Sequence, residues 1–356
     1  MAINERLIDT EVAAAGNGGG GTGNQEEGLI LHLDANDVDS YDGDGSEWVD
    51  ITNHEYTPAT NVSEHFNTVL YTGNGTSNTT EQNVTGVGFQ PDLVWIKNRA
   101  ETRNHVLVDS LRKTGNLLDE LHSNTIDPAN TTGTDNVKSL DSDGFTVLGE
   151  GSETNDNGDT FVAWCFKAGG APSGSDKVSI DGTSYSTMSV ANLTEGTISI
   201  DKLSVNTNLG FSIVSYNGNQ VSNATVAHGL GVKPELIIVK NLESAVAWAV
   251  WTTGISDSEV LRLEQTAAAT TPATAYFEPQ NNTGNVFSLG TNNETNYNYD
   301  YIAYCFASKR GVSKVGSYVG TGVAGNKVYT GFEPAFIITK RSSSAGDNWN
   351  IIDNVR

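Results

Sequence analysis

The sequence predicts an all-β fold of tandem antiparallel β-sandwich-like repeat units behind an extended N-terminal arm. The first observation is internal repetition, because one short phrase occurs three times along the 356 residues. The second is that each copy carries an unbroken apolar run bounded by turn residues, the pattern of a strand buried on both faces. The third is composition, since 38 glycines and the absence of long helical periodicity indicate short strands joined by turns.

The repeated phrase combines a tyrosine hairpin, a glycine-rich turn, a proline and an apolar run that ends in lysine. Proline presets the backbone before a strand, and lysine is expected where a strand emerges into water. The copies align at Pro91, Pro234 and Pro334. The other aligned positions are Tyr71, Tyr216 and Tyr318; the runs 93–96, 236–239 and 336–338; Lys97, Lys240 and Lys340; and His105, Trp248 and Trp349.

Two further similarities define the length of one unit. The first and third copies share Asp-x-x-Arg, and the first and second share a Glu-Thr-Asn-x-Asn segment followed by an apolar strand with one cysteine. One unit is therefore about 100 residues, and each cysteine is expected to be a free thiol in its own core. The aligned residues are Asp109–Arg112 with Asp353–Arg356, Glu153 with Glu294, and Cys165 with Cys305.

These similarities divide the chain into six segments. They are an anchoring arm with a glycine-rich linker (1–27), an acidic β segment (28–65), repeat unit 1 (66–169), a connector with short strands (170–208), repeat unit 2 (209–310) and the start of repeat unit 3 (311–356). We expect the connector to be a small module or an extension of a neighbouring sheet. Within unit 1, we expect a polar excursion over 111–144 with a short helix near 111–124.

The third unit stops at the position equivalent to Arg112, so it lacks half of its strands. An open sheet without its partner would expose apolar edges. We therefore expect either that the natural chain continues beyond Arg356 or that another chain completes the fold, and we favour continuation.

The N-terminal segment places a few apolar residues roughly on one helical side, ahead of a glycine-rich tether. Such a peptide cannot form its own core, so it is either a docking arm that inserts into a partner protein or a frayed tail. We expect a docking arm. Its attachment residues would be Ile3, Arg6, Leu7, Ile8 and Val12.

The net charge of −23 argues against a nucleic-acid partner and against anionic membranes, because like charges repel. No apolar stretch has the length of a signal peptide or a membrane span. The acidic loop with Asp37, Asp39, Asp42 and Asp44 either binds calcium or is a solvated turn, and its spacing does not match an EF-hand. We expect no resident metal and no cofactor.

Several longer phrases resemble repeat domains of bacteriophage virion proteins, which are commonest in tail-fibre-like proteins of marine and cyanobacterial phages. The phrases are LVWIKNRAETRNHVLVDSLR (93–112), FVAWCFKAGGAP (161–172) and GTISIDKLSVNTNLGFSIVSYNGN (196–219). The segment LILHLDANDVDSYDGDGSEWVDI (29–51) resembles the opening of a LamG-type, concanavalin A-like jelly roll. The resemblance implies a structural virion protein that forms a homotrimer, and it supplies no catalytic residues.

No catalytic motif is present, because the chain lacks a nucleophile elbow, a zinc-protease helix and a phosphate-binding loop. We therefore expect a protein that is not an enzyme. The repeated Asn-rich loops are either plain polar loops or glycan-contacting surfaces, and Trp248, Trp251 and Trp349 either pack in cores or stack on sugars. The candidate glycan contacts are Glu153, Asn155, Asn157, Glu294, Asn296 and Asn298.

The expected function is that of a tail fibre or spike on the surface of a phage particle. The arm would attach to other virion proteins, and the linked β domains would bind a host cell-surface glycan or protein weakly at several points. One alternative is a decoration protein on the head or neck of the virion. The other alternative is an enzyme that degrades host surface polysaccharide.

Overall fold

The computed structural model describes residues 2–4, 62–132 and 137–356, and it confirms the all-β class. Among the described strands, all pairs are antiparallel except β12 with β14. The helices of these residues are three short 3-10 turns, and none could cross a membrane. The turns are η2 (Val62–Glu64), η3 (Ala273–Ala275) and η4 (Pro279–Asn281).

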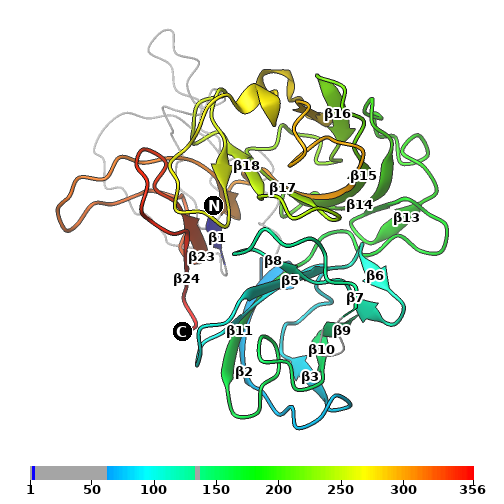
Figure 1. Ribbon diagram of the computed structural model, residues 1–356, viewed down its shortest axis with the longest axis vertical. Coiled ribbons are helices and arrows are strands. Elements are labelled where there is room, and N and C mark those ends of the chain that lie inside the picture. The colour runs from blue at the N-terminus through cyan, green and yellow to red at the C-terminus, as the bar shows by residue number, and fades with distance from the viewer. Residues whose placement is uncertain (1, 5–61, 133–136) are drawn as a thin grey trace, which may run out of the picture. The chain divides into compact units, whose positions relative to one another are not determined.

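The first repeat is a sandwich of two sheets that pack on one apolar core (Figure 1). Its five-stranded sheet has the order β2 (Phe66–Thr72), β11 (Thr160–Phe166), β4 (Leu93–Asn98), β5 (His105–Asp109) and β8 (Leu121–His122). Its three-stranded sheet contains β3 (Glu81–Thr85), β10 (Gly144–Leu148) and β9 (Val137–Asp141). A small hairpin joins β6 (Lys113–Thr114) to β7 (Leu117–Leu118).

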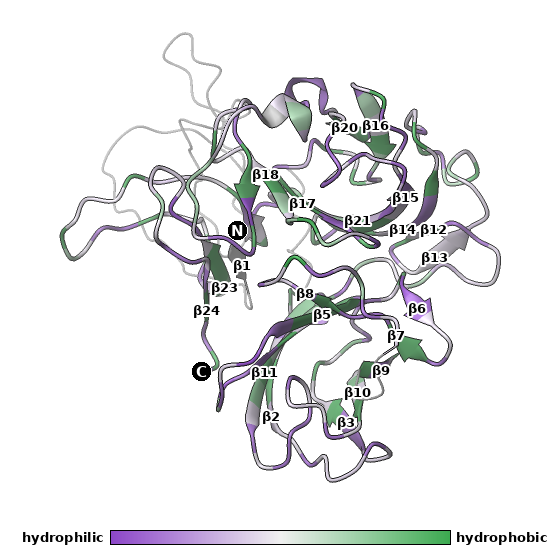
Figure 2. Ribbon diagram, viewed as in Figure 1, coloured by the Kyte–Doolittle hydropathy of each residue, from purple (hydrophilic) through white to green (hydrophobic). Residues whose placement is uncertain are grey.

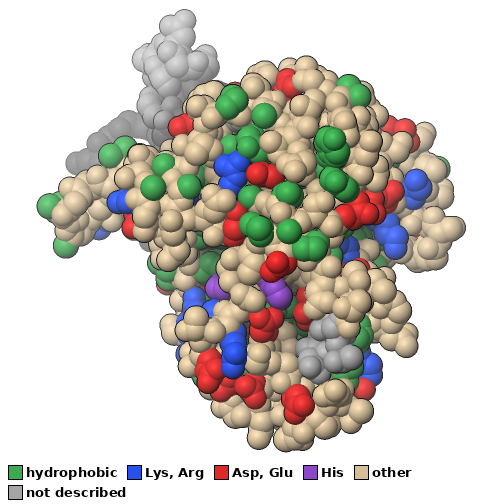
Figure 3. Space-filling model, in the orientation of Figure 1, with side chains coloured by type: hydrophobic (Ala, Val, Ile, Leu, Met, Phe, Trp, Pro, Cys, Tyr) green, Lys and Arg blue, Asp and Glu red, His purple; other side chains and the backbone are tan. Residues whose placement is uncertain are grey.

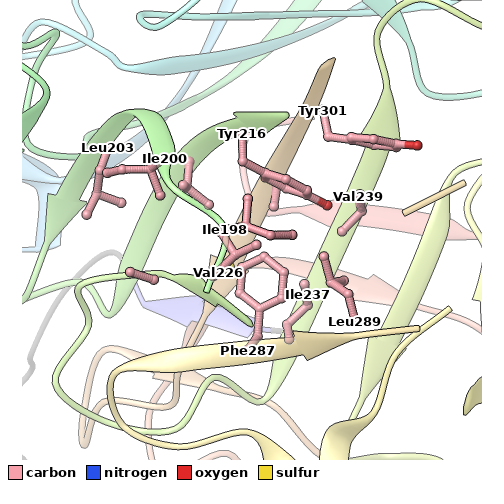
Figure 4. Packing of buried hydrophobic residues seen from close by; sticks show 14 of the residues in the cluster. Ile198, Ile200, Leu203, Tyr216, Val226, Ile237, Val239, Phe287, Leu289 and Tyr301 are labelled. Atoms are coloured by element: carbon pink, nitrogen blue, oxygen red, sulfur yellow. The ribbon is translucent and has the colours of Figure 1, made fainter. Parts of the chain in front are cut away.

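The second repeat has the same plan with a wider main sheet. Residues 178–206 of the connector supply three of its strands, so this part of the connector extends a neighbouring sheet. The sheet order is β13 (Thr183–Tyr185), β12 (Val178–Ile180), β14 (Ile200–Asn206), β15 (Phe211–Asn217), β21 (Asp300–Phe306), β17 (Leu236–Asn241), β18 (Ala249–Thr252) and β19 (Leu261–Arg262). The facing sheet pairs β16 (Ala224–Ala227) with β20 (Val286–Leu289). Figure 4 shows the hydrophobic core that residues of this pair form with residues of the main sheet.

The third repeat contributes one four-stranded sheet that includes the N-terminus of the chain. Its order is β22 (Ser313–Lys314), β1 (Ala2–Asn4), β23 (Pro334–Thr339) and β24 (Asn350–Asp353). Ile3 therefore belongs to a strand, and the helical pattern expected for the arm is wrong at this residue because backbone pairing with β23 holds it extended.

The repeated apolar runs occupy the same position in the first two repeats. Strand β4 lies between the cysteine strand β11 and β5, and β17 lies between the cysteine strand β21 and β18. The register is also shared, since Val94 faces Cys165 and Ile237 faces Cys305. The sequence repeat is therefore a repeat of backbone geometry.

Each of these runs is buried on both faces, for two different reasons. Val94 and Ile96 belong to the core of their own repeat. Leu93 and Trp95 point to the other side, where they line an apolar cavity of about 20 Å³. The same cavity is lined by Leu236, Ile238, Phe336 and Ile338, so runs from all three repeats meet there. Figure 2 shows β17 and β23 in green, the colour of hydrophobic residues.

Phe166, the last residue of the first cysteine strand, lies at the centre of an aromatic cluster. Its ring centroid is 4.9 Å from that of Phe66 in its own repeat. It is 5.7 Å from Phe211 and 6.2 Å from Phe306 in the second repeat, and 5.7 Å from Phe336 in the third. One side chain therefore joins the three repeats.

The helix expected near 111–124 is wrong, because this segment forms the short strands β6, β7 and β8. Gly115 takes a φ of +63°, which makes the turn between β6 and β7. Leu121 is buried and pairs with Leu107 of β5. Pairing with an existing sheet edge therefore overrides the local helical propensity.

Phe166→Ala should lower the free energy of unfolding by about 3–5 kcal/mol, because it removes ring contacts to all three repeats and leaves a cavity. Denaturant unfolding measures this loss. The matched control is Ile126→Ala, whose side chain is 46% exposed and should change stability by under about 0.5 kcal/mol. A loss below about 1 kcal/mol for Phe166→Ala would contradict the shared aromatic core.

Candidate functional site

The Asn-rich loops that recur in the first two repeats are fixed by a fully buried asparagine. Asn155 donates from Nδ2 to the carbonyl oxygen of Gly149 at 2.8 Å, and its Oδ1 accepts from the Asn74 amide at 3.1 Å. Asn296 makes the same two bonds in the second repeat, at 2.7 and 2.8 Å. Since both side chains are buried and used by the backbone, neither presents a surface to a glycan.

The threonine before each asparagine binds the repeated tyrosine. Tyr71 donates its hydroxyl to the carbonyl oxygen of Thr154 at 2.6 Å, and Tyr216 donates to that of Thr295 at 2.7 Å. Burial raises the pKa of Tyr216 well above its usual range, so this hydroxyl stays protonated and can donate. Within each repeat, a hydrogen bond therefore joins the tyrosine phrase to the Glu-Thr-Asn phrase, although the two are far apart in sequence.

The two glutamates of these loops each pair with a base at an equivalent position. His122 Nε2 lies 3.0 Å from Glu153 Oε2, and Arg262 Nε lies 3.3 Å from Glu294 Oε2. His122 and Arg262 correspond because each sits at the end of the strand beside β5 or β18. Each loop therefore places its glutamate beside a basic side chain, which is a histidine in the first repeat and an arginine in the second.

Each acid–base pair also lies where two repeats meet. The carbonyl oxygen of His122 accepts a hydrogen bond from Trp248 Nε1 of the second repeat, at 3.0 Å. In the same way, the carbonyl oxygen of Arg262 accepts from Trp349 Nε1 of the third repeat, at 2.9 Å. We call these two sets, Glu153–His122–Trp248 and Glu294–Arg262–Trp349, the seam clusters.

The electrostatics of the two seam clusters differ. The hydrogen bond from His122 lowers the pKa of Glu153, and the same bond raises the pKa of His122. Burial raises the pKa of Glu294, although Arg262 opposes that shift. Glycoside hydrolysis needs two carboxylates facing one bond, whereas these two belong to different repeats and each is neutralised by its own base.

Of the remaining predicted site residues, the structure describes Asn157, Asn298 and Ile3. Asn157 and Asn298 are exposed at the ends of the repeated loops, so they are free to meet a ligand. Ile3 lies in β1, paired on one side with Ser313 and on the other with Phe336. The other predicted residues lie outside the described residues: Arg6, Leu7, Ile8 and Val12 of the arm, and Asp37, Asp39, Asp42 and Asp44 of the acidic loop.

Both cysteines are buried free thiols in their own cores, as predicted, and burial raises the pKa of each. Within residues 2–4, 62–132 and 137–356, no group of three or more His, Cys, Asp or Glu side chains is placed to hold a metal ion. Trp248 and Trp251 are buried, which confirms core packing for these two, and Trp349 is half-buried.

The shared Asp-x-x-Arg phrase has a role that the sequence alone does not reveal. Asp109 Oδ2 accepts from Arg112 Nε at 2.7 Å and from the Tyr304 hydroxyl of the second repeat at 2.7 Å. Asp353 Oδ2 likewise accepts from Trp164 Nε1 of the first repeat, at 3.0 Å. The aligned aromatic residue before each cysteine was the signal that could have revealed these links between repeats.

The fold and these contacts define a class of protein: tandem β modules whose recurring motifs bond each module to itself and to the next. The chain belongs to the family described as Domain of unknown function (DUF7483), whose model matches residues 61–356. The match covers all three repeats. No curated protein and no solved structure is significantly similar to the chain.

Asn155→Ala should lower the free energy of unfolding by about 1–3 kcal/mol, because it removes the hydrogen-bond partners of the buried Gly149 carbonyl and of the Asn74 backbone N–H. Thermal or urea unfolding measures the loss. Asn157→Ala, in the same loop but exposed, is the matched control and should stay within about 0.5 kcal/mol of the wild type. Equal effects of the two substitutions would contradict a structural role for the loop motif.

The His122–Glu153 pair should make stability depend on pH. A raised histidine pKa contributes stability below its ordinary value of 6.5 that is lost as the pH rises through the folded value. A lowered glutamate pKa contributes stability above 4.5 that is lost as the pH falls. The stability difference between the wild type and His122→Gln should therefore peak near about pH 5.5, at up to about 1 kcal/mol.

The control for this pH dependence is His122→Arg, which copies the base of the second seam cluster. Arginine stays charged, so its stabilisation should persist from about pH 6 to pH 9, where that of histidine fades. Urea unfolding across this range provides the comparison. A parallel decline in the wild type and His122→Arg would show that another group is responsible.

Proposed function

We propose that the protein is a structural component of a phage virion, of the tail-fibre or spike type, that presents β modules for adhesion to a host surface. The observation that carries this proposal is how the recurring motifs are used. The buried tyrosines, asparagines and aspartates hold the modules together. Repeated polar residues that serve the structure of the modules are typical of a structural protein that presents its surface to a partner.

Adhesion would occur at exposed positions that recur from repeat to repeat. Asn157 and Asn298 stand at matching points of two repeats, and amide side chains offer the donors and acceptors that sugars need. Two weak sites on one rigid body bind a repetitive surface far more tightly than either does alone. A host glycan is therefore the partner that this arrangement suits best.

Attachment to the particle would use the N-terminal arm, including Arg6, Leu7, Ile8 and Val12. The resemblance to tail-fibre-like proteins favours a homotrimer, which would multiply the number of exposed sites by three. The net charge of −23 would make such assemblies repel one another and stay in solution.

Purified protein should block adsorption of the parent particle to its host, and Asn157→Ala with Asn298→Ala should weaken that block about tenfold or more, since both sites are lost. Counting unadsorbed particles gives the measurement, and Asn208→Ala, an exposed turn residue outside the repeated loops, is the control. Immunogold labelling should place the chain on the tail. Gold on the head, or new reducing ends in host polysaccharide, would overturn the proposal.

A further inference from the structure

The loop that follows the buried asparagine differs between the first two repeats. Asn296 is followed by Tyr-Asn-Tyr (297–299), whereas Asn155 is followed by Asp-Asn-Gly-Asp (156–159). Both asparagines make the same pair of hydrogen bonds, and both loops lead directly into the cysteine strand. The first repeat therefore closes this loop without an aromatic residue, so the fold does not account for the two tyrosines of the second.

The two tyrosines form a pair of rings at the surface. The ring centroids of Tyr297 and Tyr299 are 5.5 Å apart, and the ring planes are inclined by 30°. Tyr299 packs against the hydrophobic core of the repeat, whereas Tyr297 is 41% exposed. Neither hydroxyl makes a hydrogen bond with another residue that the structure describes. Figure 3 shows hydrophobic side chains at the surface of the second repeat, in the upper half of the view.

Hydrogen bonds hold the backbone of this loop in place. The N–H of Tyr297 donates to the hydroxyl of Tyr301 at 2.9 Å, and the carbonyl oxygen of Tyr297 accepts from the N–H of Tyr299 at 2.8 Å. The carbonyl oxygen of Tyr299 accepts from the N–H of Gly218 at 3.0 Å. Glycine is required at position 218, because a Cβ atom there would lie 2.0 Å from the Tyr297 carbonyl oxygen. A loop held in this way loses little further freedom when a ligand binds.

Side-chain amides lie beside the tyrosine pair. Asn298 is exposed between the two tyrosines, and Asn219 is exposed on the neighbouring hairpin. The N–H of Asn219 donates to Asn296 Oδ1 at 2.8 Å, which holds this hairpin against the loop. An amide offers both a donor and an acceptor, as sugar hydroxyl groups require. An aromatic ring beside such amides fits a pyranose, whose C–H face packs on the ring while its hydroxyl groups bond to the amides.

Two carboxylates at the edge of this surface select against an acidic sugar. Asp300 follows Tyr299 in the chain, and its Oδ1 accepts from Asn217 Nδ2 at 2.9 Å. Glu243 Oε2 accepts from the N–H of Asp300 at 3.0 Å, and both acidic residues are exposed. Because like charges repel, a uronic or sialic acid would be disfavoured here, whereas a neutral hexose would not.

We propose that Tyr297 is the stacking platform of a carbohydrate subsite that takes one neutral hexose. Tyr299 supports its ring, and Asn219 and Asn298 bond to the sugar hydroxyl groups. The inference rests on the proposed adhesive function and narrows it, because it assigns recognition of the sugar ring to the second repeat. The first repeat has Asn157 but no aromatic residue in this loop, so it contributes polar contacts alone.

The test is saturation-transfer NMR on the full chain with two neutral probes, methyl β-D-glucopyranoside and methyl β-D-galactopyranoside. At least one probe should bind, with saturation strongest at the C–H protons of one ring face. Tyr297→Ala should weaken binding about tenfold, whereas Tyr297→Phe should stay within about twofold of the wild type because it keeps the ring. The matched control is Tyr329→Ala, which removes an exposed tyrosine of the third repeat and should leave the affinity unchanged.

Two results would overturn the subsite: binding of neither probe, and equal binding by the wild type and Tyr297→Ala. The charge argument has its own probe, methyl β-D-glucuronopyranoside, which should bind more weakly than the neutral probes that bind. Tighter binding of this acidic sugar would contradict the proposal.

Adsorption of the parent particle separates failure of the subsite from failure of the adhesive function. If the chain binds a probe through Tyr297 but does not block adsorption, the adhesive function fails and the subsite stands. If Tyr297→Ala blocks adsorption as well as the wild type does, the subsite fails and adhesion stands. If Tyr297→Ala abolishes the block while neither probe binds the wild type, the surface recognises a protein receptor and the carbohydrate assignment is overturned.

Discussion

The structure depends on three short strands, β4, β17 and β23, which meet around a common apolar cavity. In β4 and β17 the opposite face closes the core of the strand's own sandwich, so these two strands are buried on both faces. A strand of this kind must be apolar at every position, which is why the run is unbroken in each copy. Because the face toward this cavity is covered by the neighbouring repeats, the repeats do not behave as independent domains.

The polar contacts follow from that constraint. Where the shared surface ends, a buried donor or acceptor of one repeat has to be met by another. The Tyr304 hydroxyl meets Asp109, and the indole of Trp248 meets the carbonyl oxygen of His122. Equivalent residues make the equivalent contacts to and from the third repeat, through Trp164 and Trp349. The duplicated chain therefore reuses one set of contacts between repeats.

The sequence predicted what depends on local patterns: the all-β class, the repeated strands and the buried cysteines. It could not predict what depends on pairing between distant residues. Residues 111–124 have helical propensity, but pairing with β5 decides their structure. Asn155 looks like a surface residue until the backbone folds around it. The place of β1 between β22 and β23 could not be predicted, because three residues carry no periodicity and their pairing is with residues more than 300 positions away.

The central claim is that the repeats share one core and therefore unfold together. Native-state hydrogen exchange of the two cysteine strands, β11 and β21, tests it most directly, since each is an interior strand in the main sheet of its own repeat. The account predicts one opening free energy for both strands, and it predicts that Phe166→Ala lowers the two values equally. Opening of β21 at an unchanged free energy, while β11 is destabilised, would contradict it.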